Sequence, residues 1–146
     1  MTVHSNDGAS WLTKLERIGE KSACDQHTVF NNLGHLLNAD MLKWQFYRLD
    51  GSRAVGIDGV TKAAYAERLD ERINCLINRI RKGSYQPKPA RITEIPQEDG
   101  SSRSLAISCV EDKLIQLAVS QILGKIYEPL FLPCSYGFRP GQNCHD

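Results

Sequence analysis

The feature that most constrains the fold is a pair of alternating segments, Arg91–Ile95 and Arg103–Ile107, separated by a short polar stretch. Alternation of side-chain character along a segment is the period of a β-strand. The intervening residues 96–102 are polar and contain Asp99-Gly100, a dipeptide that favours reversal of the chain. Two prolines shortly before the first segment force an extended path into it. The sequence therefore predicts an antiparallel β-hairpin with a protruding tip.

Helical spacing of apolar residues marks two stretches before residue 48. The first, Trp11–Ile18, predicts a short amphipathic helix. The second runs from about Val29 to Tyr47, and Asn38-Ala39-Asp40 allows it to break into two shorter helices. We therefore expect residues 1–48 to form a helical N-terminal extension.

Two further helices are recognisable by their ends. Thr61 is placed to cap the first, and Gly83 follows its last basic residues, where a left-handed backbone is favoured. The second begins with Ser108-Cys109-Val110-Glu111, the pattern of a capping box. Its many apolar positions predict a buried helix that ends before Pro129. Together with the hairpin, these elements predict an α+β fold in which the protruding hairpin is packed on helices.

Length and composition are those of a single soluble domain, with 146 residues, 41% hydrophobic and 24% charged. A run of about eighteen apolar residues, as a membrane span requires, is absent. The N-terminal residues lack the pattern of a secretory signal, so we expect a cytoplasmic protein.

The five cysteines lie at positions 24, 75, 109, 134 and 144, without a C-x-x-C pair. This number and spacing indicate buried, reduced thiols and neither a disulfide framework nor a zinc site. Cys144 and His145 are adjacent in the sequence, but adjacent side chains rarely converge on one atom. Neither thiol catalysis nor a metal site is therefore expected.

Basic residues gather in one segment. Between Arg72 and Thr93 there are six Lys and Arg residues and no Asp or Glu. Such a cluster suits contact with phosphates. A solvated helix end and loop has the same composition, and the charge pattern alone leaves both interpretations open.

Two glycine-rich segments invite a functional interpretation. Gly51 and Gly56 have the spacing of a phosphate-binding loop, but Ile57 and Asp58 stand where Lys and Ser or Thr are required. A structural turn is therefore predicted there. The segment 137–141, Gly-Phe-Arg-Pro-Gly, imposes a fixed backbone on its side chains, which leaves base stacking and core packing as alternatives for its rings.

Four carboxylates are candidates for a Mg²⁺ site, and each has a local structural role instead. Asp58 and Asp99 neighbour glycines in turns, where Asp is common for backbone reasons. Glu111 belongs to the capping box and Asp112 lies in the first turn of a helix. The sequence therefore predicts no polymerase-type metal site in this chain.

Taken in order, the motifs of this chain resemble those of group II intron-type reverse transcriptases. The similarity extends from about Val29 to the end of the chain. Each motif is short, and the ordered set is specific. The motifs are Ala54–Thr61, Tyr85–Pro89, the hairpin Ile95–Ile107, Val110–Lys113, Tyr127–Phe131 and Ser135–Gly141.

The resemblance implies the N-terminal, fingers-side piece of a right-hand polymerase that copies RNA into DNA. Residues 49–146 would be the partial reverse transcriptase domain, truncated before the palm. Implied partners are intron or template RNA, a DNA primer and a deoxynucleoside triphosphate, with Mg²⁺ as the cofactor of the full-length family. Many members also assist splicing as maturases. The family's catalytic aspartates lie in the palm, so no catalytic residue is expected here.

The resemblance also implies roles for particular residues. Arg103 matches the hairpin arginine that contacts the triphosphate, and Gln97 stands where the family has a lysine. An alternative is an RNA-binding, maturase-like fragment without polymerase activity, and another is a decayed, truncated reading frame. The residues expected to contact RNA are Arg53, Lys62, Lys82, Lys88, Arg91 and Arg139.

Overall fold

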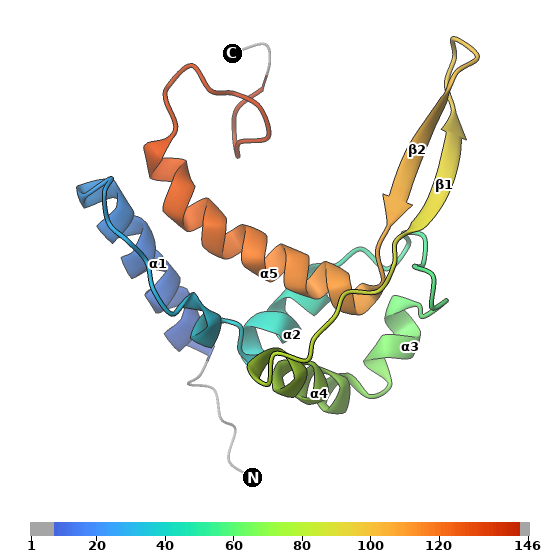
Figure 1. Cartoon of the computed structure of the whole chain (residues 1–146), viewed down its shortest axis with the longest axis horizontal. Helices are drawn as coiled ribbons and strands as arrows, with labels where there is room; N and C mark the ends of the chain where they lie inside the picture. Colours follow the sequence, from blue (N-terminus) through green and yellow to red (C-terminus); the bar gives the residue numbers. More distant parts are fainter. Residues whose placement is uncertain (1–7, 144–146) are drawn as a thin grey trace. The chain divides into compact units, whose positions relative to one another are not determined.

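The computed structural model describes residues 8–143 and divides into two compact units. One unit comprises residues 1–36 and 119–146, and the other comprises residues 37–118. The last long helix, α5 (Val110–Tyr127), contributes its first half to the second unit and its second half to the first. Figure 1 shows the order of the elements. None of the helices in the described part is long and apolar enough to cross a membrane.

The unit formed by the two ends of the chain contains α1 (Gly8–Cys24), the 3-10 helix η1 (Leu33–Leu36) and a second 3-10 helix, η2 (Glu128–Leu130). The prediction of a helix around Trp11–Ile18 is confirmed, and the helix extends beyond it at both ends. α1 contacts η2, and the buried Ser22 hydroxyl donates a 2.5 Å hydrogen bond to the carbonyl of Ile126. Trp11 and Leu15 are almost fully buried.

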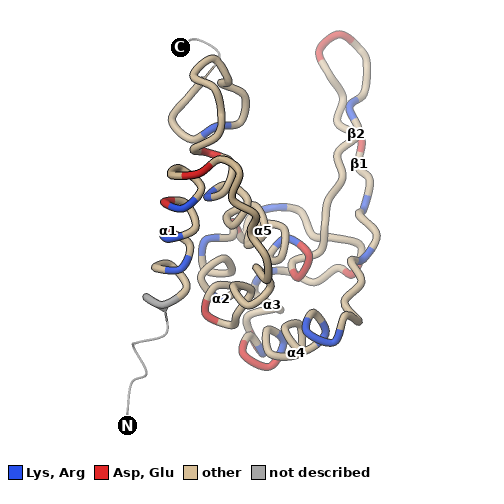
Figure 2. Tube along the Cα trace, turned by 60° about the vertical axis from the view of Figure 1, so that its left-hand side comes forward, with Lys and Arg blue, Asp and Glu red and all other residues tan. Residues whose placement is uncertain are grey.

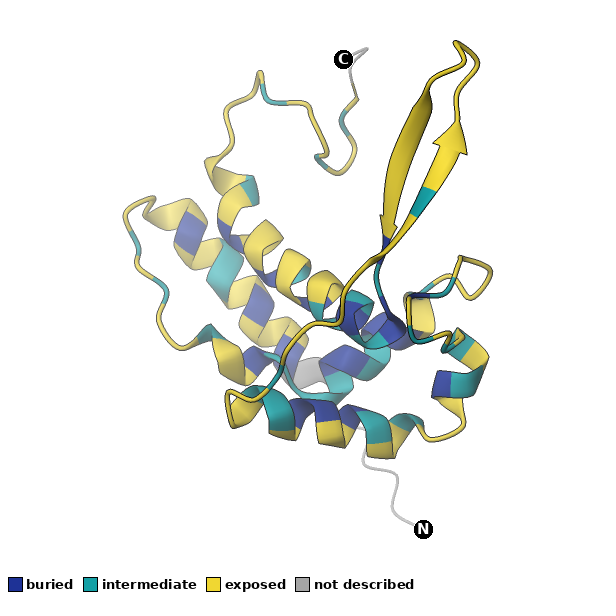
Figure 3. Ribbon diagram, turned by 45° about the vertical axis from the view of Figure 1, so that its right-hand side comes forward, coloured by how far each residue is buried: buried dark blue, intermediate teal, exposed yellow. Residues whose placement is uncertain are grey.

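The unit formed by residues 37–118 contains three helices before its hairpin: α2 (Ala39–Arg48), α3 (Lys62–Ala66) and α4 (Leu69–Arg81). α2 and α3 both contact α4. Its apolar core is contributed by all three helices, by the end of the hairpin and by the first half of α5 (Figure 3). The core side chains are Met41, Leu42, Phe46, Tyr65, Ile73, Leu76, Ile77, Ile107, Cys109, Val110, Leu114 and Ala118.

Local signals placed several helix ends correctly. The Asn38 side chain caps α2 by accepting from the Met41 amide at 2.9 Å, which confirms a break at this point. The Thr61 hydroxyl caps α3 by accepting from the Ala64 amide at 3.1 Å. Gly83 follows α4 with a φ of 67°. The prediction of a helix beginning at Val29 was wrong, because regular structure starts only at Leu33.

The predicted helix from Thr61 to Gly83 is divided in two at residues 67–68. Arg68 has φ −131° and ψ 45°, outside the helical region. Ahead of the break, the buried Tyr65 ring lies 5.9 Å from the Phe46 ring of α2. This packing places α3 separately from α4, whose own buried residues include Ile73 and Leu76.

The capping box at Ser108 was also a wrong prediction. α5 begins at Val110, so Cys109 precedes it, and the first helical hydrogen bond runs from Lys113 N to Cys109 O. Glu111 instead forms a 2.5 Å ion pair with Arg79. The Ser108 hydroxyl accepts from the Gln116 amide at 3.3 Å. A tertiary ion pair therefore takes the place of the local cap.

The predicted hairpin is present, as β1 (Arg91–Pro96) paired antiparallel with β2 (Ser102–Ile107). It protrudes as predicted, but the predicted packing on helices is confined to its base. Thr93 is half-buried and Ile107 is buried. Every other residue of the two strands is exposed. The hairpin therefore projects from its unit as an arm that is buried only at its base (Figures 1 and 3).

Two further expectations about burial need correction. α5 is buried on one side only: Leu114 and Ala118 are inaccessible, whereas Leu117 and Leu123 are about 40% exposed. Of the four cysteines in the described residues, all are free, but only Cys109 is buried. Cys24, Cys75 and Cys134 are exposed, against the expectation of buried thiols. The Cys144–His145 pair lies outside the described residues.

Candidate nucleic-acid interface

The hairpin brings the two predicted nucleotide contacts onto one face. Arg103 pairs with Ile95 across the two strands, and the backbone of Gln97 continues the pairing by donating to Ser101 O at 2.8 Å. Paired residues share a face of the sheet, as do residues two apart along a strand. Arg103, Ile95 and Gln97 therefore belong to the same face. The Gln97 side chain accepts from the Ser101 hydroxyl at 3.2 Å.

The segment leading into the hairpin is fixed to the start of α5 by one buried carboxylate. Asp112 is 3% exposed and accepts hydrogen bonds from the Tyr85 hydroxyl and, at 3.1 Å, from the Lys88 backbone amide. Burial and the hydrogen bond to Asp112 both raise the pKa of Tyr85, so this hydroxyl stays protonated at neutral pH. These bonds hold the base of the arm in a defined position.

The glycine-rich loop of residues 50–59 is a second support for the base of the arm. Lys88 Nζ lies 2.9 Å from the Asp58 carboxylate, and Arg91 Nε donates to Val55 O at 3.1 Å. Burial opposes ionisation of Asp58, but the bonds from Lys88 and the Val60 amide outweigh it and hold the pKa of Asp58 below its usual value. The Asp58 carboxylate in turn raises the pKa of Lys88. The prediction of a structural turn at this loop fits these contacts.

A groove of about 350 Å³ lies at the base of the arm, within the unit of residues 37–118. Two cations, Arg53 and Lys113, lie on it; the side chain of Arg53 is 76% exposed and pairs with Asp50, which does not line the groove, at 3.4 Å. Lys113 Nζ also donates to Ala54 O at 3.2 Å. None of the lining residues is acidic, so the groove suits an anionic ligand. The complete lining consists of Arg53, Ala54, Leu105, Ala106, Ile107, Ser108, Lys113 and Gln116.

The residues predicted to contact RNA have different surroundings. Arg53 lies on the groove, and Lys82, at the exposed end of α4, has no ion pair within the described residues. Lys88 and Arg91 belong to the contacts at the base of the arm. Lys62 Nζ donates to Leu49 O at 2.5 Å. Figure 2 shows the distribution of charge along the chain, including the basic end of α4.

Arg139 is placed in the other unit and is held internally. Its guanidinium lies 2.8 Å from the Glu128 carboxylate and donates to the carbonyls of Leu132 and Ser135. Its side chain is 11% exposed, and it lies over the Phe131 ring at 5.4 Å. These contacts fix the turn of residues 131–140 and leave little of the guanidinium for a ligand.

Sequence reasoning missed two polar residues of the groove, Lys113 and Gln116. Lys113 is part of the motif Val110–Lys113, which was noted only as a family resemblance. The position of Lys113 beside Ala54 depends on a contact between residues 59 positions apart, which no local pattern reveals.

The four carboxylates that the sequence offered for Mg²⁺ are engaged elsewhere. Asp58 pairs with Lys88, Glu111 pairs with Arg79, and Asp112 accepts from Tyr85. Asp99 accepts from the Ser101 amide and hydroxyl within the hairpin turn. Among residues 8–143, no three His, Cys, Asp or Glu side chains are grouped to hold a metal ion. The described residues therefore do not fit the Mg²⁺ that the resemblance implies.

Comparison with known proteins identifies the class. The chain is a homologue of group II intron-encoded proteins, which confirms the resemblance drawn from its motifs. No protein-family model matches it.

Three relatives show the extent of the similarity. The group II intron-encoded protein LtrA of Lactococcus lactis subsp. cremoris is 35% identical over 90% of this chain and 22% of its own length. Protein YkfC of Escherichia coli K12 is 37% identical over 65% of this chain and 25% of its own length. An uncharacterized 91 kDa protein in the cob intron of Schizosaccharomyces pombe is 31% identical over 92% of this chain and 17% of its own length. The chain thus spans about a quarter or less of the length of these relatives.

Proposed function

We propose that this chain is the fingers-side part of a group II intron-encoded reverse transcriptase and maturase, and that it holds RNA at the base of its hairpin. The groove between Arg53 and Lys113 is the observation that carries this proposal. It combines two cations, the absence of acidic lining residues and a position beside the motifs shared with the family. The groove also has an apolar wall, formed by Leu105, Ala106 and Ile107. A sugar or base of the RNA can pack on this wall while the neighbouring phosphates contact the two cations.

In this function, the projecting arm contacts the incoming nucleotide. Arg103 is exposed on the same face as Gln97, and an arginine offers several donors in a geometry that matches phosphate oxygens. Gln97 is uncharged and can only donate a neutral hydrogen bond from its amide. The arm therefore supplies one charged contact to a triphosphate. The template RNA, the DNA primer and the deoxynucleoside triphosphate are the partners in this scheme.

RNA binding to the full 146-residue chain tests the groove. Removing both cations, with Arg53→Ala and Lys113→Ala together, is expected to weaken binding of a labelled single-stranded RNA by about tenfold at moderate salt. The slope of log K against log salt should fall by about 0.7 for each RNA phosphate that is no longer neutralised by a side chain. Fluorescence anisotropy at a series of salt concentrations measures both quantities.

Arg68→Ala is the matched control. Arg68 is an exposed arginine of the same unit, its side chain is 72% exposed, and it does not line the groove. It should bind RNA as the unchanged chain does. A loss in the control that is half as large as that of the double variant on the scale of log K would show that binding follows total charge, and an unaffected double variant would remove the groove from the proposal.

Primer extension separates the polymerase proposal from the two alternatives. The chain by itself should incorporate no deoxynucleotide on an RNA template with Mg²⁺, because the described residues provide no cluster of carboxylates to hold the ion. A mixture with a separately made palm-containing portion of a relative should incorporate nucleotide, and Arg103→Ala should reduce that incorporation. Templated product from the chain alone would contradict the proposal. RNA binding without any complementation would favour the maturase-like alternative.

A further inference from the structure

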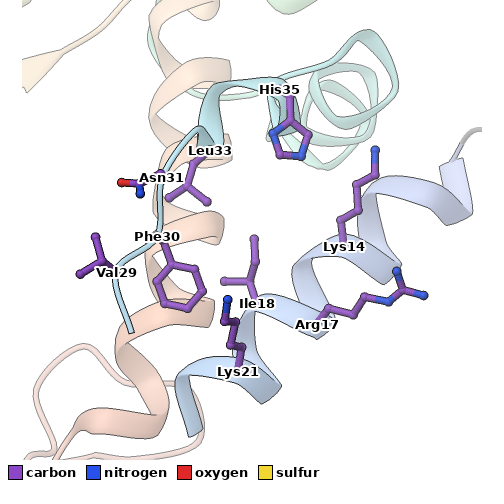
Figure 4. A pocket seen from close by; sticks show the side chains of 9 residues that line it. All are labelled: Lys14, Arg17, Ile18, Lys21, Val29, Phe30, Asn31, Leu33 and His35. Carbon is purple, nitrogen blue, oxygen red and sulfur yellow. The ribbon is translucent and has the colours of Figure 1, made fainter. Parts of the chain in front are cut away.

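A second groove, of about 300 Å³, lies in the unit formed by the two ends of the chain. One wall is α1 and the other is the segment of residues 29–35 (Figure 4). Lys14, Arg17 and Lys21 stand along the α1 side, and Ile18, Phe30 and Leu33 contribute apolar surface. This groove shares no residue with the one at the base of the hairpin.

The three cations form one line on α1. They are separated by three and four residues, the spacing that places side chains on one side of a helix. At about 100° per residue, Glu16 is about 100° or more around the helix from each of the three cations, whereas Glu20 lies one turn from Arg17 at the edge of this line. No lining residue is acidic, and the three cations form no ion pair within residues 8–143. Their charge is therefore available to an external anionic partner.

The apolar part of the groove restricts the kind of partner. Ile18, Phe30 and Leu33 are half-buried, so each still presents carbon surface to the groove. Val29, beside them, is 76% exposed and adds further aliphatic surface. A ligand that fills this groove must match both the row of cations and an aliphatic surface.

We propose that this groove binds an acidic amphipathic helix of a partner protein. A helix lying along α1 repeats its side chains at the same interval, so its carboxylates can meet Lys14, Arg17 and Lys21 in succession. Its apolar side chains then pack on Ile18 and Leu33. An RNA strand fits less well, because the apolar surface from Ile18 and Leu33 is aliphatic and Phe30 is half-buried, which leaves little ring surface for bases to stack on.

The test uses the full chain and a fluorescein-labelled helical peptide in which leucines and glutamates recur at spacings of about three and four residues. Anisotropy should show saturable binding that weakens with salt. Arg17→Ala combined with Lys21→Ala should weaken it by about tenfold, and Val29→Ser by about threefold. Val29 is exposed, so its substitution should leave the fold intact, and circular dichroism checks this.

Two controls sharpen the result. Lys125→Ala changes an exposed cation of the same unit that does not line the groove, and it should bind the peptide normally. The same peptide with glutamine in place of glutamate should bind weakly. Absence of binding, or equal binding of the glutamine peptide, would overturn the proposal. The proposal would also be overturned if a single-stranded RNA displaced the peptide and if binding of that RNA required Arg17 and Lys21 but not Val29.

Discussion

Gly56→Ala is expected to lower the free energy of unfolding of the unit of residues 37–118 by about 2–3 kcal/mol. Gly56 is buried, and a β-carbon placed on it would lie 2.7 Å from both the Cα and the N of Cys109. These are backbone atoms at the start of α5, so they cannot move aside as the end of a long side chain does. The loop of residues 50–59 must shift away from α5 instead. Chemical denaturation followed by circular dichroism measures the loss.

Gly51→Ala provides the control in the same loop. Its added β-carbon would meet the side chain of Lys62 at 3.3 Å, and that flexible chain can rotate away. The expected change in stability is within about 0.5 kcal/mol. The displaced loop in Gly56→Ala should also separate from Arg91 and Lys113, so RNA binding should weaken before the chain unfolds. A Gly56→Ala chain as stable as the original would contradict the close packing of this loop on Cys109.

Asp112→Ala should cost about 2–3 kcal/mol, since it leaves two donors without their acceptor. The Tyr85 hydroxyl and the Lys88 amide both donate to this carboxylate, which is 3% exposed. Asp112 also lies in the first turn of α5, where a negative charge favours the helix dipole. The segment of residues 85–91 should consequently become mobile, and amide hydrogen exchange there should accelerate. Urea denaturation gives the loss of stability.

Tyr85→Phe is the matched partial change, because it removes one hydrogen bond and keeps the ring. It should lower the free energy of unfolding by about 1 kcal/mol. The combination of Asp112→Ala and Tyr85→Phe should lower it by less than the sum of the two single effects. Burial and the bond to Asp112 raise the pKa of Tyr85 in the folded chain above 10, its ordinary value. The contribution of the hydroxyl to the free energy of unfolding is therefore complete below pH 10 and is lost as the pH rises further. Tyr85→Phe should reduce this alkaline loss. Additive single effects would show that the two groups do not interact.

Elements specified by neighbouring residues were predicted well. The predicted break at Asn38-Ala39-Asp40 and the predicted cap at Thr61 each coincide with a side chain bound to an amide three residues on, and Gly83 adopts the left-handed backbone that few residues tolerate. The hairpin follows from alternation on both sides of Asp99-Gly100, with Gly100 at φ 82°. All of these depend on interactions that span only a few positions of the chain.

Elements that depend on distant partners were predicted poorly. Nothing in Ala66-Glu67-Arg68 favours a break, because these residues form helices readily. The break accompanies the packing of Tyr65 on Phe46, which belongs to another helix. Similarly, Glu111 pairs with Arg79, 32 positions earlier, where the local pattern predicted a cap. Long-range contacts outweigh such local preferences, since each preference amounts to about 1 kcal/mol or less.

The sequence by itself determined the hairpin and its protruding tip, because the turn at Asp99-Gly100 and the alternation on both sides of it bring the two segments together. It also determined the homology to group II intron-encoded proteins, since ordered motifs survive in the chain. Only the tertiary structure decided the register that places Arg103 and Gln97 on one face, and that Arg53 and Lys113 share a groove. The physical reason is distance along the chain. Gly56 and Cys109 can meet only after the core of their unit has formed.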